Sequence, residues 1–230
     1  MHALLDHLAK SGFTRAPRLL DVDEEKGYEY LSYLPGEVGY PPIRAPWQTD
    51  EALRAAAHLI REYHDAVADF TPPENARWRF MVGAPRTGEI ICHNDIANYN
   101  LLYSDGLPSA LIDWDFAAPA GRTWDLAQAM WYLVPLHTPA YCRSVGWAEV
   151  DVPRRLRLFC DAYGLPEDDR VGLIDLVAER QTVTFRTMDT WAAQGVPGFA
   201  ELVENPPEIT ERADAPHLRR HRDLWQRALL

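Results

Sequence analysis

Residues 90–116 read IICHNDIANYNLLYSDGLPSALIDWDF. Apolar residues on both sides place the polar part of this stretch in a loop between two buried strands. Each unpaired polar group in a buried loop costs about 1–3 kcal/mol, so a polar loop at this position indicates a function. His93 lies two residues before Asp95, and Asn100 lies five residues after it. A second acid, Asp113, follows thirteen residues beyond Asn100 in another apolar run.

These residue types match the few parts that phosphoryl transfer needs. One carboxylate accepts or orients the proton of the attacking hydroxyl group, a role that suits Asp95. An amide oxygen and a second carboxylate hold the metal ion that neutralises the phosphates, and Asn100 and Asp113 suit these roles. Mg²⁺ prefers oxygen ligands, which both side chains provide. Asp115 is either a second metal ligand or a solvated acid.

The same residues allow other interpretations. Asp95 could be a plain turn residue. The pair Asp113-x-Asp115 could be the metal pair of a nucleotide-sugar transferase, although no Rossmann-like unit precedes it. For His93 we favour a structural role, in which the ring orients the loop through hydrogen bonds, over acid–base chemistry.

The spacing resembles that of a known family. His93-x-Asp95 with Asn100 is similar to the catalytic loop of the aminoglycoside-phosphotransferase-like family, a branch of the protein-kinase-like superfamily. Residues 112–115 resemble its metal-binding segment, and residues 124–127 resemble the start of the helix that follows. The resemblance extends over nearly the whole chain and is strongest to small bacterial members, some of them labelled trifolitoxin-immunity-like. It does not fix their substrates.

This resemblance implies an α+β, protein-kinase-like fold with two lobes. Residues 1–36 would form a truncated N-terminal lobe of helix, β-hairpin and hinge, and residues 37–230 a mostly helical C-terminal lobe. The implied activity is transfer of the γ-phosphoryl group of ATP or GTP, with Mg²⁺, to a hydroxyl group of a small molecule. In the family the residue matching Asp125 braces the catalytic loop, so Asp125 and His93 are expected to be supporting residues. The alternative is a non-catalytic pseudokinase or immunity-type binding protein on the same scaffold.

The nucleotide would be held by the hinge. Tyr33 and Leu34 are candidates because backbone groups there could pair with the adenine edge while aliphatic side chains cover the ring. An ordinary linker between lobes is the competing interpretation.

Two parts of a kinase-like N-terminal lobe are missing from this sequence. No glycine-rich phosphate loop is present, and neither Lys10 nor Lys26 suits the usual strand lysine. A start codon assigned too late, a natural truncation with weak catalysis, and a binding-only protein each explain this. The hairpin would keep only two strands, so we expect residues 28–33 to form an unprotected edge. Either a neighbouring molecule covers this edge, as in a homodimer, or the region is poorly ordered.

Hydrophobic and turn patterns outline the remaining elements. A helix is expected from Thr49 to about Phe70, and short strands flank a turn over residues 104–108. The other expected elements are a helix over 2–11, strands over 18–22, 28–34, 89–92, 101–103 and 110–112, and helices over 124–133, 153–163, 167–193, 198–205 and 214–229.

Composition restricts the partners and the compartment. Lys and Arg number 23 against 34 Asp and Glu, a net charge of −11. This balance argues against a nucleic-acid partner and favours a cationic small molecule or simply solubility. The three cysteines are widely spaced, which suits a reducing compartment. No apolar run of about 18 residues is present, so the sequence predicts a cytoplasmic protein without a membrane span.

Overall fold

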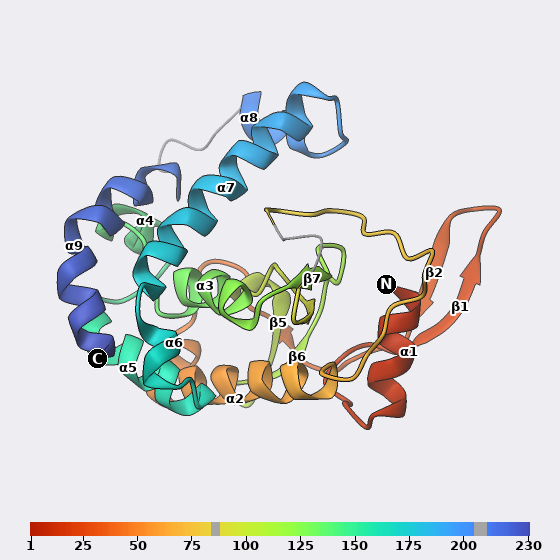
Figure 1. Ribbon diagram of the computed structural model, residues 1–230, viewed down its shortest axis with the longest axis horizontal. Helices are drawn as coiled ribbons and strands as arrows, with labels where there is room; N and C mark the ends of the chain where they lie inside the picture. The colour runs from red at the N-terminus through yellow and green to blue at the C-terminus, as the bar shows by residue number, and fades with distance from the viewer. Residues whose placement is uncertain (84–87, 205–210) are drawn as a thin grey trace.

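The computed structural model describes residues 1–83, 88–204 and 211–230. It begins with helix α1 (His2–Lys10) and a hairpin of strands β1 (Leu19–Asp23) and β2 (Tyr28–Leu31). The hairpin projects from one end of the molecule beside α1 (Figure 1). Leu4, Leu5 and Leu8 of α1 are buried, so the helix is fixed to the body by its apolar face.

Short strands form the centre of the molecule. β3 (Glu37–Val38), β5 (Leu101–Ser104) and β6 (Leu107–Leu111) make an antiparallel sheet in the order β3-β5-β6. β4 (Ile90–Cys92) pairs separately with β7 (Ala118–Ala120). The β5–β6 hairpin is tighter than predicted. Asp105 and Gly106 both have positive φ, +51° and +83°, which suits a two-residue turn whose twist matches the strands.

Helices make up most of the remainder and surround the central strands (Figure 1). α5 packs against both α2 and α9, and α7 packs against α3, α8 and α9. Nearly all of α3 is buried, because it lies at the centre of this group. The helices are α2 (Asp50–Ala66), α3 (Arg122–Leu133), α4 (Pro139–Ser144), α5 (Val152–Tyr163), α6 (Glu167–Arg170), α7 (Leu173–Ala193), α8 (Phe199–Glu204) and α9 (Asp214–Leu229), with single 3-10 turns at Ala45–Gln48 (η1), Asn98–Asn100 (η2) and Glu211–Ala213 (η3).

The predicted α+β class, with small sheets and a helical remainder, is confirmed, but some boundaries differ. Thr49 caps α2 as predicted, its Oγ1 accepting from the Ala52 amide at 3.1 Å. The helix ends at Ala66 rather than near Phe70. The single helix predicted over 167–193 is two helices, α6 and α7, because Gly172 between them adopts a left-handed φ of +76°.

Other features were not predicted at all. Helix α4, strands β3 and β7 and the 3-10 turns are too short to produce a hydrophobic period. Within the described ranges, no helix combines the length and the apolar character needed to cross a lipid bilayer. The division into lobes at residues 36 and 37 stays a prediction.

Candidate functional site

A buried carboxylate accepts hydrogen bonds from the backbone of the polar loop after β4. Asp125 lies in the first turn of α3 and is fully buried. Its Oδ2 accepts from the His93 backbone amide at 3.0 Å, and its Oδ1 from the Asn94 amide at 2.8 Å. The ring of His64 lies between two groups: its Nε2 is 3.0 Å from Asp125 Oδ2, and its Nδ1 is 2.8 Å from the Tyr163 hydroxyl oxygen.

These hydrogen bonds set the charge of Asp125. Burial alone would raise the pKa of this carboxyl group, but the hydrogen bond and charge of His64 and the Asn94 amide hold the pKa below its usual value. Asp125 is therefore an ionised acceptor whose hydrogen bonds link α2, α3 and the loop. Its supporting role in a catalytic site stays a prediction.

Asn94 turns the chain at the base of the loop. It adopts a left-handed φ of +62°, which only a few residue types tolerate. Its Nδ2 lies within hydrogen-bonding distance of the carbonyl groups of Phe116, at 3.2 Å, and Ala118, at 3.1 Å. The amide thus links the loop to the segment that follows Asp113.

A buried arginine supports the same turn from α7. Arg180 is 1% exposed, and its Nη2 donates to the Asn94 carbonyl oxygen at 2.5 Å. Its guanidinium group lies 5.3 Å from the centre of the Trp124 ring. Burial lowers the pKa of Arg180, and the nearby charges of Asp95 and Asp125 oppose that effect. A positive charge is thereby buried directly behind the loop.

Asp95 lies at the outer end of the turn and is half-buried. Its Oδ2 accepts from Asn100 Nδ2 at 2.8 Å, and its Oδ1 accepts from Gln128 Nε2 at 3.3 Å. Burial raises the pKa of Asp95 to about 6; the charge of Arg180 opposes this rise and that of Asp113 adds to it. Above that pH the carboxylate is ionised and can accept a proton near neutrality.

Asn100 and Asp113 lie on neighbouring segments. The Asn100 Nδ2 group donates to both Oδ2 and the carbonyl oxygen of Asp95, so the Asn100 amide oxygen is the atom that remains to hold a cation. The Ile112 amide donates to the Asn100 carbonyl oxygen at 3.0 Å, which places Asp113 one residue beyond this pairing. Asp113 is exposed and has a φ of +62°. An amide oxygen and an exposed carboxylate fit a hard divalent cation such as Mg²⁺.

Two further predicted residues have defined partners. Asp115 forms an ion pair with Arg79, 2.7 Å from Oδ2 to Nη1, so it is not simply a solvated acid. His93 is buried and donates from Nε2 to the Ile112 carbonyl oxygen at 3.1 Å, with its ring 4.6 Å from the Trp114 ring. Burial lowers the pKa of His93, so its ring is neutral near pH 7 and orients the segment before Asp113.

A cleft of about 590 Å³ joins the predicted hinge to the acidic segment. Tyr33 and Leu34 line it together with Asp113 and Asp115, whereas Asp95 and Asn100 are not part of its wall. Its volume is in the range of small-molecule sites. The Tyr33 side chain is 85% exposed, so the hinge would offer mainly backbone groups to a ligand.

His64, Arg180 and Gln128 were not predicted from the sequence to lie at the site. His64 and Arg180 nevertheless gave a signal, because each falls on the apolar stripe of its helix, where a polar side chain needs a buried partner. The identity of that partner depends on tertiary packing, and the helical period of the sequence gives no information about it.

Two sequence comparisons relate this chain to known proteins. A model of the family described as phosphotransferase enzyme family matches residues 1–89 and 76–171. The trifolitoxin immunity protein of Rhizobium leguminosarum bv. trifolii is 36% identical over 192 residues, which cover 81% of this chain and 70% of that protein.

Solved structures are similar in fold at low sequence identity. The amicoumacin kinase hAmiN, in complex with AMP-PNP, Ca²⁺ and Ami, matches with a TM-score of 0.62 at 10% identity, over 98% of this chain and 76% of that one. A choline/ethanolamine kinase family protein from Mesorhizobium loti matches with a TM-score of 0.55 at 16% identity, over 99% and 81%. The kinase-like α+β fold predicted from the sequence is confirmed.

Proposed function

Because this chain belongs to the phosphotransferase enzyme family, we propose that it transfers the γ-phosphoryl group of ATP or GTP to a hydroxyl group of a small molecule. The observation that carries the proposal is the position of Asp95. Its Oδ2 lies 2.8 Å from Asn100 Nδ2. Burial raises the pKa of its carboxyl group to about 6, and the charge of the exposed Asp113 adds to this rise. A proton acceptor beside two oxygen ligands is the arrangement that this reaction requires.

Each residue would have a separate role. Asp95 would accept the proton of the acceptor hydroxyl group, while Arg180 and Asp125 fix the loop beneath it. The amide oxygen of Asn100 and the carboxylate of Asp113 would hold Mg²⁺, with Asp115 available as a further ligand. When bound there, Mg²⁺ neutralises charge on the phosphate groups. Amicoumacin kinase has been solved with AMP-PNP and Ca²⁺, which supports a nucleotide and a divalent cation as the ligands.

The nucleotide base would lie at the hinge. Tyr33 and Leu34 line the same cleft as Asp113, so a base paired with the hinge backbone could direct its phosphates toward the acidic segment. Leu31 and Leu102 give this cleft apolar surface for a planar ring.

We propose that the acceptor binds beside Asp95, near Tyr99. The Tyr99 hydroxyl donates to Asp95 Oδ1 at 3.4 Å, and the Tyr99 ring lies edge-on to the Tyr132 ring at 5.5 Å. The charge of Glu211 also acts on both tyrosines. Aromatic faces next to a carboxylate favour a cationic acceptor, in keeping with the net charge of −11.

A non-catalytic immunity-type binding function is the second candidate. The 36% identity to an immunity protein favours it, because that name describes protection from a toxin and not a reaction. Both candidates use the same scaffold, and they differ in the expected effect of replacing Asp95, because only the enzyme needs its carboxylate for turnover.

Nucleotide binding is directly measurable by thermal unfolding. Ligand at about one hundred times its dissociation constant adds about 2.7 kcal/mol of stability. For a chain of this size we expect ATP with Mg²⁺ to raise the Tm by about 5–10 °C. EDTA should remove most of the shift, and Asp113→Asn should remove the metal-dependent part. Absence of any shift with ATP or GTP, with or without Mg²⁺, would contradict the proposal.

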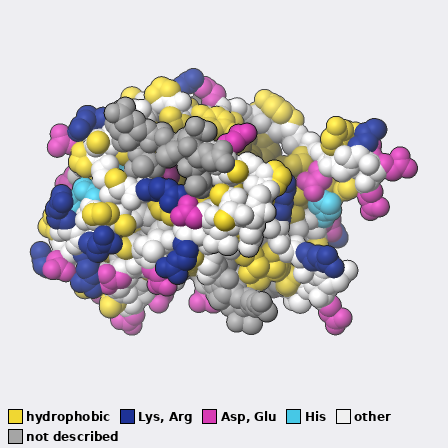
Figure 2. Space-filling model, turned by 90° about the horizontal axis from the view of Figure 1, so that it is seen from above, with side chains coloured by type: hydrophobic (Ala, Val, Ile, Leu, Met, Phe, Trp, Pro, Cys, Tyr) yellow, Lys and Arg dark blue, Asp and Glu magenta, His cyan; other side chains and the backbone are white. Residues whose placement is uncertain are grey.

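The exposed hairpin has an unpaired edge through which a second copy of the chain could bind. Tyr28 and Tyr30 are 59% and 48% exposed, and in the described part of the chain β2 pairs with β1 alone. Figure 2 shows the hairpin at the right-hand end of the molecule, with charged and hydrophobic side chains exposed on it. We propose that two copies pair through the edge formed by residues 28–33.

Hydrogen exchange at several protein concentrations tests this pairing. Amides of residues 28–33 should become protected as the concentration rises, whereas amides of β5, which lies between two strands, should be protected throughout. Full protection of residues 28–33 in a proven monomer, or no protection at any concentration, would rule the dimer out.

A further inference from the structure

The cleft that joins the hinge to Asp113 has an unusual charge balance. Glu29, Asp113 and Asp115 all line it. Among the described residues of its wall, Arg79 is the one Lys or Arg side chain. A triphosphate entering this cleft would face three carboxylates, so it needs positive charge besides the metal ion. Arg79 is the side chain that can supply it.

The guanidinium group of Arg79 is available for such a contact. Its Nη1 lies 2.7 Å from Asp115 Oδ2, and the side chain is 67% exposed. An ion pair at this exposure contributes only about 0–1 kcal/mol, so exchanging the carboxylate for another anion costs little. Phosphate oxygens are strong acceptors for the planar guanidinium group, which can bind them through two parallel hydrogen bonds.

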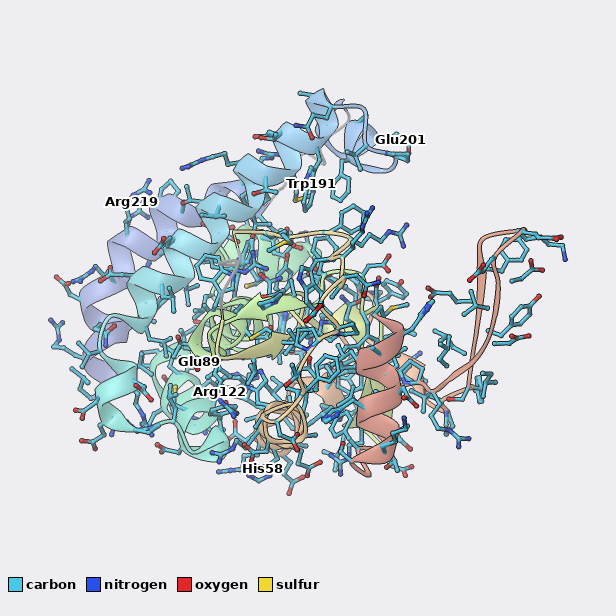
Figure 3. The ribbon with its side chains drawn as sticks, turned by 45° about the vertical axis from the view of Figure 1, so that its right-hand side comes forward. His58, Glu89, Arg122, Trp191, Glu201 and Arg219 are labelled. Atoms are coloured by element: carbon cyan, nitrogen blue, oxygen red, sulfur yellow. The ribbon has the colours of Figure 1, made fainter. Side chains whose placement is uncertain are left out.

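The backbone at Arg79 is anchored by its neighbour. The ring of Phe80 lies 5.1 Å from that of Phe116, 5.2 Å from Trp191 and 5.4 Å from Phe199. Trp191 extends from α7 toward the central part of the molecule (Figure 3). Phe116 directly follows Asp115, so this aromatic cluster fixes the segment of Arg79 against the acidic segment. The guanidinium group itself lies 5.3 Å from the centre of the Phe80 ring.

We propose that Arg79 binds the phosphate groups of the nucleotide, in a role that a strand lysine fills in most kinase-like proteins. This inference rests on the nucleotide-dependent function proposed above. On nucleotide binding the guanidinium group exchanges the Asp115 carboxylate for phosphate oxygens, and Asp115 becomes free to face the metal ion. The positive charge that contacts the phosphate groups thus comes from the loop after α2. In most kinase-like proteins it comes from a lysine on a strand of the N-terminal lobe.

Arg77 provides a matched control in the same loop. It is exposed, and it lines a neighbouring cavity of about 470 Å³ that also contacts Arg79, but it is not part of the cleft that holds Asp113. Replacing Arg77 therefore makes the same change in net charge without removing the proposed phosphate contact.

Isothermal titration with ATP and with adenosine tests the inference without measuring turnover. Arg79→Ala should weaken ATP binding by about 10- to 100-fold, because a hydrogen bond to a charged group typically contributes that much to affinity. It should leave adenosine binding unchanged, because adenosine has no phosphate group. Arg79→Lys should retain part of the ATP affinity, and Arg77→Ala should retain all of it.

The outcomes distinguish a failure of the Arg79 role from a failure of the nucleotide-dependent function. An unchanged ratio of ATP to adenosine affinity in Arg79→Ala, or an equal loss in Arg77→Ala, would overturn the role of Arg79 alone. A wild-type protein that binds neither ATP nor GTP would overturn the proposed function and this inference with it. Because Arg79 is an exposed side chain, the variants should fold, and circular dichroism checks this.

Discussion

Asp95→Asn is expected to reduce turnover by about 10²–10⁴-fold, the usual contribution of a positioned general base. The amide cannot accept the proton of the acceptor hydroxyl group, yet it still offers an oxygen to the Asn100 Nδ2 group that now lies 2.8 Å from the carboxylate. Nucleotide affinity should therefore stay close to that of the wild type. Steady-state kinetics combined with titration of ATP measures both quantities.

A matched control is available in Asp105→Asn, which makes the same chemical change in the exposed β5–β6 turn. This variant should keep full turnover. If Asp95→Asn retained wild-type turnover, Asp95 would not be the base. If the wild type showed no turnover and Asp95→Asn kept its biological effect, the binding function would be favoured.

The same substitution has a pH-dependent effect on stability, measured in EDTA. Below pH 3.8 Asp95 is protonated in both the folded and the unfolded chain. Between pH 3.8 and about 6 the unfolded chain releases this proton while the folded chain keeps it. The free energy of unfolding therefore falls by up to about 3 kcal/mol as the pH rises through this range. Asp95→Asn should therefore unfold at a higher temperature than the wild type above pH 6 and at a similar temperature near pH 3. In the wild type, turnover should fall as the pH drops below about 6.

The sequence contains the local part of this site but not its long-range part. The spacing of Asp95, Asn100 and Asp113 between apolar runs is enough to predict two strands and the loop, which the structure contains, and a set of oxygen ligands, which stays a prediction. All these features lie within one stretch of chain, residues 90–116, and local patterns report such features well.

Residues that support the loop come from distant helices. His64 and Arg180 reach it from α2 and α7, and Arg79 reaches Asp115 across 36 residues of chain. A polar side chain on an apolar stripe shows that a buried partner exists, but it does not show which one. The break at Gly172 was missed for a related reason, since a helical period continues across a single left-handed residue.

Removing the Asp125 carboxylate should have the largest effect on stability. Asp125→Ala leaves two buried backbone amides and the ring of His64 without their acceptor, while Arg180 keeps its buried charge behind the loop. Breaking a buried charged network in this way costs about 3–5 kcal/mol. For a chain of this size we expect the Tm to fall by about 6–20 °C.

The pH dependence identifies the carboxylate as the cause. The pKa of Asp125 in the folded chain is below its usual value, so the stabilisation is present above the unfolded pKa and is lost as the pH falls through the folded one. The difference in Tm between wild type and Asp125→Ala should therefore be greatest near neutrality and shrink in strong acid. Asp65→Asn, which alters an exposed acid on α2, should change the Tm by little at any pH, because surface ion pairs contribute only about 0–1 kcal/mol. An Asp125→Ala variant as stable as Asp65→Asn would mean that the loop carrying Asp95 is held by Asn94 and Arg180 alone.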